Sequence, residues 1–561
     1  MNAVYAKDYN ILPGMDKCHI KEIQEMFSEH RSETCFVFEP GQYHFYQNNT
    51  YKRRYPSSNS NQADRLNIAL LLEDMSSITI DGHGADFIFH GDMTPIAVSG
   101  CAVIDIENLS IDFAVPLTAE ARILRAEQGA VEILLDRDMF PYRIFNETIM
   151  FDRGFGQEAP LTGALEFDAR TNKVREGAGD TFPKVKAYEA GNDIIRLEGE
   201  FHILPKAGNI LVLRHGSRIH PGVLVQYSED ITFNNIMVHQ TGGLGFLFQF
   251  NKDISVSGVS FEANYAKGLK VVNGHDDGLH FSNNRGTITV RDCKFMGLMD
   301  DPVNVHGTAV CIVEKSSSNT LRCEYRHPQS AGFAGWAVKG DRVAFIRPDN
   351  RMCYAEAEVL EYRLLSCTDF ELVLNSPMPS GMYPGDALEN LTNTPSLVCH
   401  GNYFGSTRAR GILVTTPRPV LIEDNVFESS GSAILLAGDV NEWYESGTCE
   451  DVVIRRNQFL RCATSFYQFC NAVIDVEPSV EMGQDQIVHH NIRIEDNLFL
   501  LSSPALLYAD HTGDLILEGN CIYMEEAGRA AEVTLIRCKN AVIGCNMLTG
   551  AGELIVNERI G

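Results

Sequence analysis

A short strand pattern recurs along this chain, and it constrains the fold more than any other feature. Each copy has two or three β-branched residues, a small or Asn turn residue, an apolar residue and a second short strand, as in VLIEDNVFESSGSAILLAG and IRIEDNLFLLSSPALLYA. In the C-terminal part the turn residue is an asparagine, and successive copies place it at Asn402, Asn425, Asn457, Asn497, Asn520 and Asn546.

The shortest interval between copies is about 23 residues, and it is found again between Asn235 and Gly258. A unit of this length, with insertions in some copies, predicts a solenoid with three short strands and three turns per coil. Equivalent strands of stacked coils pair at about 4.8 Å. The fold class expected is therefore all-β, a right-handed parallel β-helix. Asn and Gly suit the recurrent turn because they adopt positive φ at less cost than other residues. The repeat has no helical apolar face, which excludes a helical solenoid.

Two segments interrupt this repeat. They contain alternating runs such as AEARILRAEQGAVEILL and AEAEVLEYRLL, which predict antiparallel hairpins and two inserted β-barrel-like domains. The chain is expected to divide into an N-terminal cap with the first coils, a first inserted domain, coils with the acidic motifs, a second inserted domain and the C-terminal coils, at 1–113, 114–215, 216–307, 308–395 and 396–561.

The segment MDKCHIKEIQEMFSEH at 15–30 has helical apolar spacing at Ile20, Ile23, Met26 and Phe27. The strand-like segment CFVFEPGQYHF follows it. A helix in this place would cover the open end of the solenoid and block the addition of further strands.

The 561 residues carry a formal net charge of −27. This charge disfavours nucleic acids and anionic membranes as partners, and it makes a neutral glycan an easier ligand than a polyanionic one. No stretch approaches the ~20 apolar residues of a membrane span, and no signal-peptide pattern is recognisable. The 15 cysteines lack zinc-like spacing and are read as free thiols. A reducing compartment and removal of an export signal both fit, so the localisation stays open.

Two acidic motifs, NGHDDGLHF at 273–281 and MDDPVNVHG at 299–307, are offset by the length of one coil. Aligning them places Asp276 over Asp300, Asp277 over Asp301 and His280 over Asn304. Carboxylates one coil apart, about 5 Å, repel each other and raise at least one pKa, which folding alone does not require. Glycosidases use such groups as a general acid and a base or nucleophile. A single Asp-Asp pair is more often a turn cap, but two in register, with His275, His280 and His306 beside them, favour catalysis.

Neighbouring residues extend this column. Arg410 takes the position of Asp301 in the next copy, with Arg408 close by, and Lys267 lies on the preceding turn. These cations would keep some carboxylates ionised and bind sugar hydroxyls, although a surface arginine is often only solvated. The longer loop GDVNEWYESG at 438–447 carries Trp443 and Glu445. The tryptophan is either a platform for a sugar ring or a cover for the core.

Several segments resemble the α-1,3-galactosidases of glycoside hydrolase family 110: MDDPVNVHG, STRARGILVTTPRPVLIEDN, SAILLAGDVNEWYESG and HPGVLVQYSEDITFNNI. The resemblance covers most of the chain, both inserted segments included. It implies a β-helix enzyme that removes terminal α-1,3-linked galactose from blood-group-B-type or linear B-type glycans, with inversion and without a cofactor. The partner expected is a galactose-terminated oligosaccharide or glycoconjugate, and no metal site is expected.

The resemblance implies that Asp277, Asp300 and Asp301 form the catalytic cluster, in which aspartates activate water and a glutamate is the general acid. Inverting glycosidases hold their two carboxyl groups about 6.5–9.5 Å apart, so stacked aspartates are too close to serve as both. Glu324, on the second inserted segment, is the first candidate for the acid and Glu445 is the second.

Two other functions remain open at this stage. A polygalacturonase-like β-helix glycosidase also uses aspartates on successive coils, although its basic carboxylate-binding motif is not evident. A non-catalytic glycan-binding β-helix explains the solenoid and the aromatic loop but not the registered carboxylates. The sequence leaves open whether the chain forms a homodimer.

Overall fold

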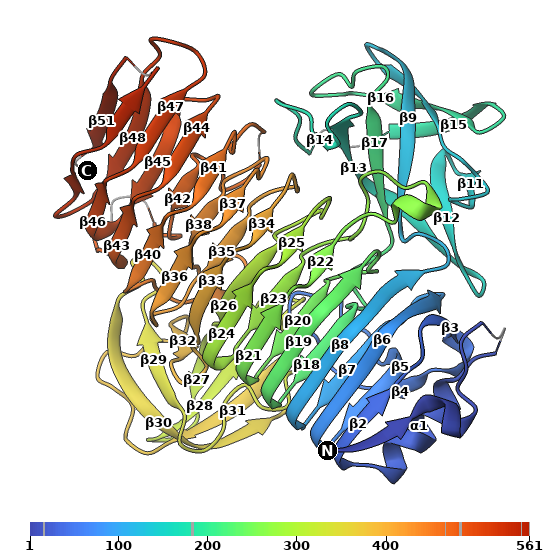
Figure 1. Ribbon diagram of the computed structural model, residues 1–561. Helices are drawn as coiled ribbons and strands as arrows, with labels where there is room; N and C mark the ends of the chain where they lie inside the picture. The colour runs from blue at the N-terminus through green and yellow to red at the C-terminus, as the bar shows by residue number, and fades with distance from the viewer. Residues whose placement is uncertain (15–16, 181–184, 466, 482–484, 551, 560–561) are drawn as a thin grey trace.

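The computed structural model describes residues 1–14, 17–180, 185–465, 467–481, 485–550 and 552–559. These residues form a right-handed parallel β-helix that runs from the N-terminal coils to the C-terminal coils, with two insertions on different sides (Figure 1). The predicted fold class is confirmed. The division into five segments at the boundaries given above stays a prediction.

The solenoid is built on a 22-stranded sheet and a 14-stranded sheet, in which equivalent strands of successive coils pair in parallel. The 14-stranded sheet positions the site. Its central strands are β18 (Val223–Gln226), β20 (Phe246–Gln249), β23 (Leu279–Ser282), β26 (Val303–Thr308), β35 (Ile412–Val414), β38 (Ile434–Leu436) and β42 (Ile474–Val476).

The recurrent asparagines form a hydrogen-bonded ladder through the core. Asn425 Nδ2 donates to Asn457 Oδ1 at 3.0 Å, and Asn457 Nδ2 donates to Asn497 Oδ1 at 3.1 Å. The reason given for these residues from sequence was wrong, because the left-handed residue is the one before the asparagine, as at Asp424 with φ 56°. Their side chains satisfy buried backbone groups of the turn. Among the turn residues named from the sequence repeat, only the separate pair Asn235 and Gly258 has positive φ, at 52° and 60°.

Phenylalanines one coil apart form a second column inside the solenoid. The ring centroids are 5.2 Å apart between Phe295 and Phe404, 4.5 Å between Phe404 and Phe427, and 5.1 Å between Phe427 and Phe459. Stacking of this kind adds about 0.5–1.5 kcal/mol per pair beyond burial of the rings. The two columns fix the register of the coils and therefore the register of the site.

Each insertion has its own apolar core. The first runs from β9 (Thr118–Glu127) to β17 (Ile210–His215) and is a nine-stranded antiparallel sheet. The second runs from β27 (Val310–Lys315) to β32 (Ala387–Asn390) and closes into a barrel around the buried Trp336.

The predicted N-terminal helix is confirmed as α1 (Ile20–Glu29), which buries Ile20, Ile23, Met26 and Phe27. It lies at the N-terminal end of the solenoid (Figure 1), and Gln24 Nε2 donates to the Leu71 carbonyl of β5 (Leu66–Glu73) at 3.2 Å. All 15 cysteines lie among the described residues, and none of them forms a disulfide. Within the described ranges, no helix is long and apolar enough to cross a membrane.

Candidate active site

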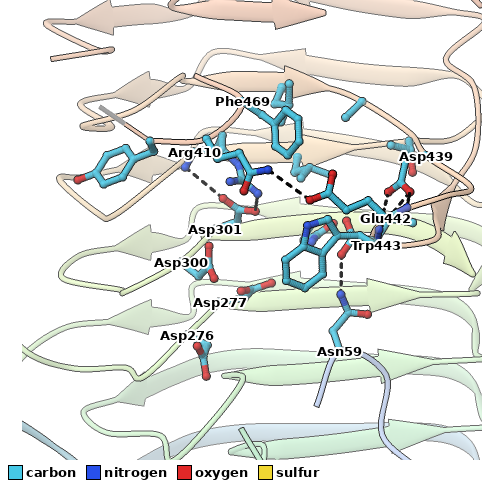
Figure 2. A pocket seen from close by; sticks show the side chains of 18 of the residues that line it. Asn59, Asp276, Asp277, Asp300, Asp301, Arg410, Asp439, Glu442, Trp443 and Phe469 are labelled. Atoms are coloured by element: carbon cyan, nitrogen blue, oxygen red, sulfur yellow. Dashed lines mark hydrogen bonds and ion pairs between the residues drawn. The ribbon is translucent and has the colours of Figure 1, made fainter. Parts of the chain in front are cut away.

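The structure confirms the register that aligns the two acidic motifs. Strands β23 and β26 pair in parallel with His280 opposite Asn304, and β26 pairs with β35 so that Asn304 is opposite Leu413. The four aspartates therefore lie on successive coils just before their strands begin (Figure 2). Arg410, three residues before Leu413, continues the column above Asp301, as the sequence predicted.

A cavity of about 340 Å³ opens beside this column. One wall carries Asp276, Asp277, Asp300 and Asp301, and the facing wall is the loop 438–447 with Trp443 (Figure 2). The remaining lining comes from the first insertion and from segments far away in the sequence, among them Asn59, Asp180, Arg214, Arg218, Tyr467, Phe469 and Glu477.

Asp276 is held as an anion. Its carboxylate lies 2.7 Å from Arg214 Nη2, 3.3 Å from Arg218 Nε and 2.7 Å from His275 Nδ1. Burial favours the neutral form, but Arg218, His275 and Arg214 outweigh it and hold the pKa of Asp276 well below its ordinary value. This aspartate anchors the two arginines.

The other three aspartates have different surroundings. Asp277 accepts from Arg218 Nη2 at 3.1 Å, and Asp301 accepts from Arg410 Nη2 at 2.8 Å and from the Arg410 backbone N–H at 3.1 Å. Burial raises the pKa of Asp277 and of Asp301; Asp300 raises both further, while the paired arginine opposes this. The Asp300 side chain is 19% exposed, against 3% for Asp277 and 2% for Asp301, so it is the most accessible to a ligand.

The predicted basic residues Arg408 and Arg410 are both in the cavity. Arg408 Nε donates to Asp180 Oδ1 at 2.7 Å and Nη1 donates to Asp300 Oδ1 at 3.4 Å, so it ties the first insertion to the aspartates. The expectation that Lys267 lies beside the stacked aspartates was wrong, because Lys267 is not among the residues that line the cavity. Its ammonium lies 2.7 Å from Asp112 and donates to the Phe113 carbonyl at 2.8 Å, which fixes a turn of the solenoid.

Asn304 lines the cavity, but the three predicted histidines do not. His275, His280 and His306 are 3%, 0% and 1% exposed and lie beneath the aspartates. They contact carboxyl groups or one another instead of the cavity. This corrects the expectation that they bind a substrate directly.

The predicted loop residues Trp443 and Glu445 line the cavity. The Asp439 carboxylate accepts from the backbone N–H groups of Asn441 at 2.9 Å, Glu442 at 2.6 Å and Trp443 at 3.1 Å, which folds the loop around it. The Trp443 ring centroid is 4.9 Å from that of His327 on the second insertion, and the residue stays 37% exposed. It is therefore a partly open aromatic surface above the aspartates.

Glu324, the first candidate for the general acid, is not among the residues that line the cavity, so the structure does not support that choice. In β28 (Thr320–Glu324), Leu321 and Cys323 point into the barrel core, so Glu324 points outward, where its carboxylate lies 3.2 Å from Arg326 Nη2. Glu445, on β39 (Glu445–Ser446), is in the cavity and accepts from Asn59 Nδ2 at 2.5 Å.

Several lining residues were missed from sequence, and those that contact the predicted acidic residues or their arginine partners are Asn59, Asp180, Arg214 and Arg218. Arg218 Nη1 lies 4.0 Å from Asp300, so its guanidinium reaches three of the four aspartates. The sequence signal that could have indicated Arg214 and Arg218 is their position, because both stand where the first insertion returns to the solenoid. Asn59 lies in the polar segment PSSNSNQ, which reads as an ordinary loop.

A parallel β-helix that gathers buried aspartates and arginines around a ligand-sized cavity has the fold and the groups of a β-helix glycosidase. Residues 119–211 match the GLAA-B beta-barrel domain I, and residues 320–388 match the GLAA-B beta-barrel domain II. Alpha-1,3-galactosidase B of Bacteroides thetaiotaomicron is 36% identical over 556 residues, which cover 96% of this chain and 90% of that protein.

Alpha-1,3-galactosidase A of Bacteroides fragilis is 33% identical over 565 residues, covering 98% of this chain and 93% of its own. The chain therefore belongs to the α-1,3-galactosidase family, and it is a glycosidase. Among solved structures, the catalytic unit of a GH87 α-1,3-glucanase from Streptomyces thermodiastaticus has a TM-score of 0.42 and 10% identity, covering 98% of this chain and 68% of that one.

Proposed function

We propose that this protein is an exo-acting, inverting galactosidase that removes terminal α-1,3-linked galactose from linear B-type or blood-group-B-type glycans. The observation that carries the proposal is the cluster of Asp277, Asp300 and Asp301, stacked on two coils and lining one cavity together with Glu445. Membership in the α-1,3-galactosidase family supports galactose as the sugar and α-1,3 as the linkage. A volume of about 340 Å³ is near the lower end for ligand sites, which suits one terminal sugar better than a long chain.

The paired charges favour a neutral sugar. Among the described residues of the lining, each arginine already contacts an aspartate: Arg214, Arg218, Arg408 and Arg410. No unpaired guanidinium is therefore left there for the carboxylate of a uronic acid. This favours galactose over the polygalacturonate expected for the alternative β-helix glycosidase.

In this proposal, the two carboxyl roles of an inverting enzyme fall to two different segments that line the cavity, the aspartate column and the loop 438–447. Asp300 and Asp301 orient a water molecule and take its proton as it attacks the anomeric carbon. Glu445 gives its proton to the glycosidic oxygen as the bond to the leaving sugar breaks, so each turnover consumes one water. Inversion requires the base and the acid to be far enough apart for this water to fit between them.

Glu445 replaces Glu324 as the proposed general acid because it lines the cavity and Glu324 does not. The placement also assigns a role to Trp443, two residues away on the same loop. With the leaving oxygen beside Glu445, the exposed indole face is positioned to stack on the leaving sugar. Aromatic faces are suited to this because a sugar ring presents an apolar face of C–H groups.

Proton NMR during hydrolysis tests the reaction. The protein is incubated with α-1,3-linked galactobiose and, separately, with a branched B-type oligosaccharide. Initial appearance of β-galactose from galactobiose is the expected result, and the branched substrate reports whether a fucose on the neighbouring galactose is tolerated. Initial release of α-galactose would exclude inversion, and absence of galactose in both samples would exclude the proposed substrate.

A pair of matched variants tests the acid. Glu445→Gln should lose about 10²–10⁴-fold in kcat on galactobiose, yet keep most activity on an aryl galactoside, whose leaving group needs little protonation. Glu324→Gln is the control and should stay close to the wild type on both substrates. Equal losses on both substrates in Glu445→Gln, or the selective loss in Glu324→Gln, would contradict the assignment.

A further inference from the structure

A chain of hydrogen bonds beneath the cavity ends on Asp277. Asp277 Oδ2 lies 2.7 Å from His280 Nδ1, His280 Nε2 lies 2.9 Å from His306 Nε2, and His306 Nδ1 lies 2.7 Å from the Gly307 carbonyl oxygen. The two imidazole planes meet at 78°. Both histidines are buried, and His306 Nε2 also lies 3.9 Å from Glu445 Oε1, which belongs to the proposed acid.

The far end of the chain fixes the first proton, and a neutral His306 fixes the rest. A carbonyl oxygen only accepts, so His306 Nδ1 must carry a hydrogen and donate it to Gly307. A neutral His306 then has a lone pair on Nε2, and His280 Nε2–H donates to it. His280 Nδ1 is left as an acceptor. The hydrogen in the last bond therefore belongs to Asp277 Oδ2.

We propose that Asp277 is a neutral carboxylic acid in the resting enzyme, with its hydroxyl donating to His280 Nδ1. Its Oδ1 accepts from Arg218 Nη2 at 3.1 Å, and its single proton is held in the bond from Oδ2 to His280. Asp277 then neither takes a proton from water nor presents one to the leaving oxygen. This refines the proposed function, on which it rests, by leaving Asp300 and Asp301 as the carboxylates that activate water and making Asp277 a positioning residue.

The electrostatics of the cluster agree with this assignment. Asp277 faces Arg218 but also Asp300, Asp276 and Glu445. Burial raises the pKa of Asp277, and the charge of Asp300 raises it further against the opposition of Arg218. Burial lowers the pKa of His280. A neutral acid beside a neutral imidazole avoids placing a third negative charge next to Asp300 and Asp301.

Infrared spectroscopy reads the protonation directly and does not depend on turnover. The difference between wild-type protein and Asp277→Asn at neutral pH should contain the carbonyl stretch of a protonated carboxyl group. Nitrogen-15 NMR of histidine-labelled protein should show one protonated nitrogen on each ring, Nε2 of His280 and Nδ1 of His306, assigned with His280→Gln. A carboxylate band for Asp277, or two protonated nitrogens on His306, would overturn the proposal.

Kinetics give a second test, because asparagine reproduces a neutral aspartic acid at this site. Its amide would donate to His280 Nδ1 and its oxygen would accept from Arg218. Asp277→Asn should lose no more than about tenfold in kcat, whereas Asp277→Ala, which breaks the chain, should lose about a hundredfold. The matched control is Asp301→Asn, where the same change neutralises a working carboxylate and should cost about 10³-fold.

Equal losses in Asp277→Asn and Asp301→Asn would overturn the positioning role of Asp277. If galactosidase activity were absent altogether, the infrared and NMR results would still decide the protonation of Asp277. Failure of the proposed function and failure of this inference are therefore distinguishable.

Discussion

Asn59 Nδ2 donates to Glu445 Oε1 at 2.5 Å, although the two residues are far apart in the sequence. The amide is held in this orientation because Asn59 Oδ1 accepts from Ser330 Oγ at 3.1 Å and from Ser58 Oγ at 3.0 Å. The bond thus joins the N-terminal polar segment, the second insertion and the loop 438–447. It fixes one oxygen of the proposed acid and leaves the other for the leaving sugar.

Asn59→Ala should therefore lower kcat on galactobiose about 10–100-fold, since a side chain out of position transfers its proton less effectively. The loss on an aryl galactoside should be several-fold smaller, because that leaving group departs with little protonation. Steady-state kinetics on both substrates check this expectation. The control is Ser60→Ala, in the same segment, whose hydroxyl donates only to the Ser58 carbonyl at 3.1 Å; a similar loss there would assign the effect to the loop as a whole.

Arg218→Met should destabilise the protein as well as lower its activity. The guanidinium contacts Asp276 and Asp277 and is 17% exposed, and removing one partner from a buried charge cluster costs about 3–5 kcal/mol. Urea unfolding at pH 7 measures the difference from wild type. Arg125→Met is the control, because its pair with Glu127 is 67% and 42% exposed and contributes at most about 1 kcal/mol.

The difference in unfolding free energy between the wild type and Arg218→Met should depend on pH in a definite direction. Arg218 is the largest of the charges that depress the folded-state pKa of Asp276, so the stability it confers is present above the unfolded-state value near ~4 and is lost as the pH falls below it. The gap between wild type and Arg218→Met should thus narrow below about pH 4. A gap that stays constant with pH would show that the loss comes from packing instead of charge.

The solenoid and the aspartate register could be predicted from sequence because both follow from one period. Residues one coil apart lie above each other, so an offset of one coil length places His280 opposite Asn304 without knowledge of the rest of the chain. The turn asparagines could be located in the same way. Their role was mistaken because a repeat shows which residue type recurs and not whether its backbone or its side chain is needed.

The rest of the site depends on contacts that no period encodes. Asp180 enters from the first insertion, Arg218 from the segment that follows it, and Asn59 from a segment before any acidic motif. Glu324 was misplaced because the direction of a side chain on a strand depends on which alternate residues fill the core. Leu321 and Cys323 fill it here, and this turns Glu324 toward Arg326.

Asn457→Ala tests the ladder. Asn457 Oδ1 accepts from Asn425 Nδ2 at 3.0 Å, and its own amide donates to the Ile422 carbonyl at 2.9 Å. Alanine leaves these buried groups without partners, at a cost of about 1–3 kcal/mol each, so a total of about 3 kcal/mol is expected in urea unfolding. Asn557→Ala, at an exposed position of β51 (Leu554–Arg559), should cost no more than about 0.5 kcal/mol. Equal effects would mean that the ladder adds little.

Asp475 should make the protein less stable at neutral pH than at about pH 4. It lies in β42 on the same column as Asn304. Its Oδ2 accepts from the Asn471 backbone N–H at 2.6 Å, and its buried Oδ1 has no hydrogen-bond partner among the residues that the structure describes. Burial raises its pKa to about 7. Because the folded-state pKa is above the unfolded-state value near ~4, its contribution to stability is complete below about pH 4 and is lost as the pH rises to 7.

Asp475→Asn removes this titration. The wild type should therefore lose up to about 1.4 kcal/mol of unfolding free energy per pH unit relative to Asp475→Asn between about pH 4 and pH 7. Urea unfolding of both proteins at four pH values in that range measures the difference. Asp138→Asn, at an exposed position on the first insertion, corrects for the loss of one negative charge. Parallel curves for wild type and Asp475→Asn would show that Asp475 ionises in the folded protein without penalty, which its burial among apolar strands argues against.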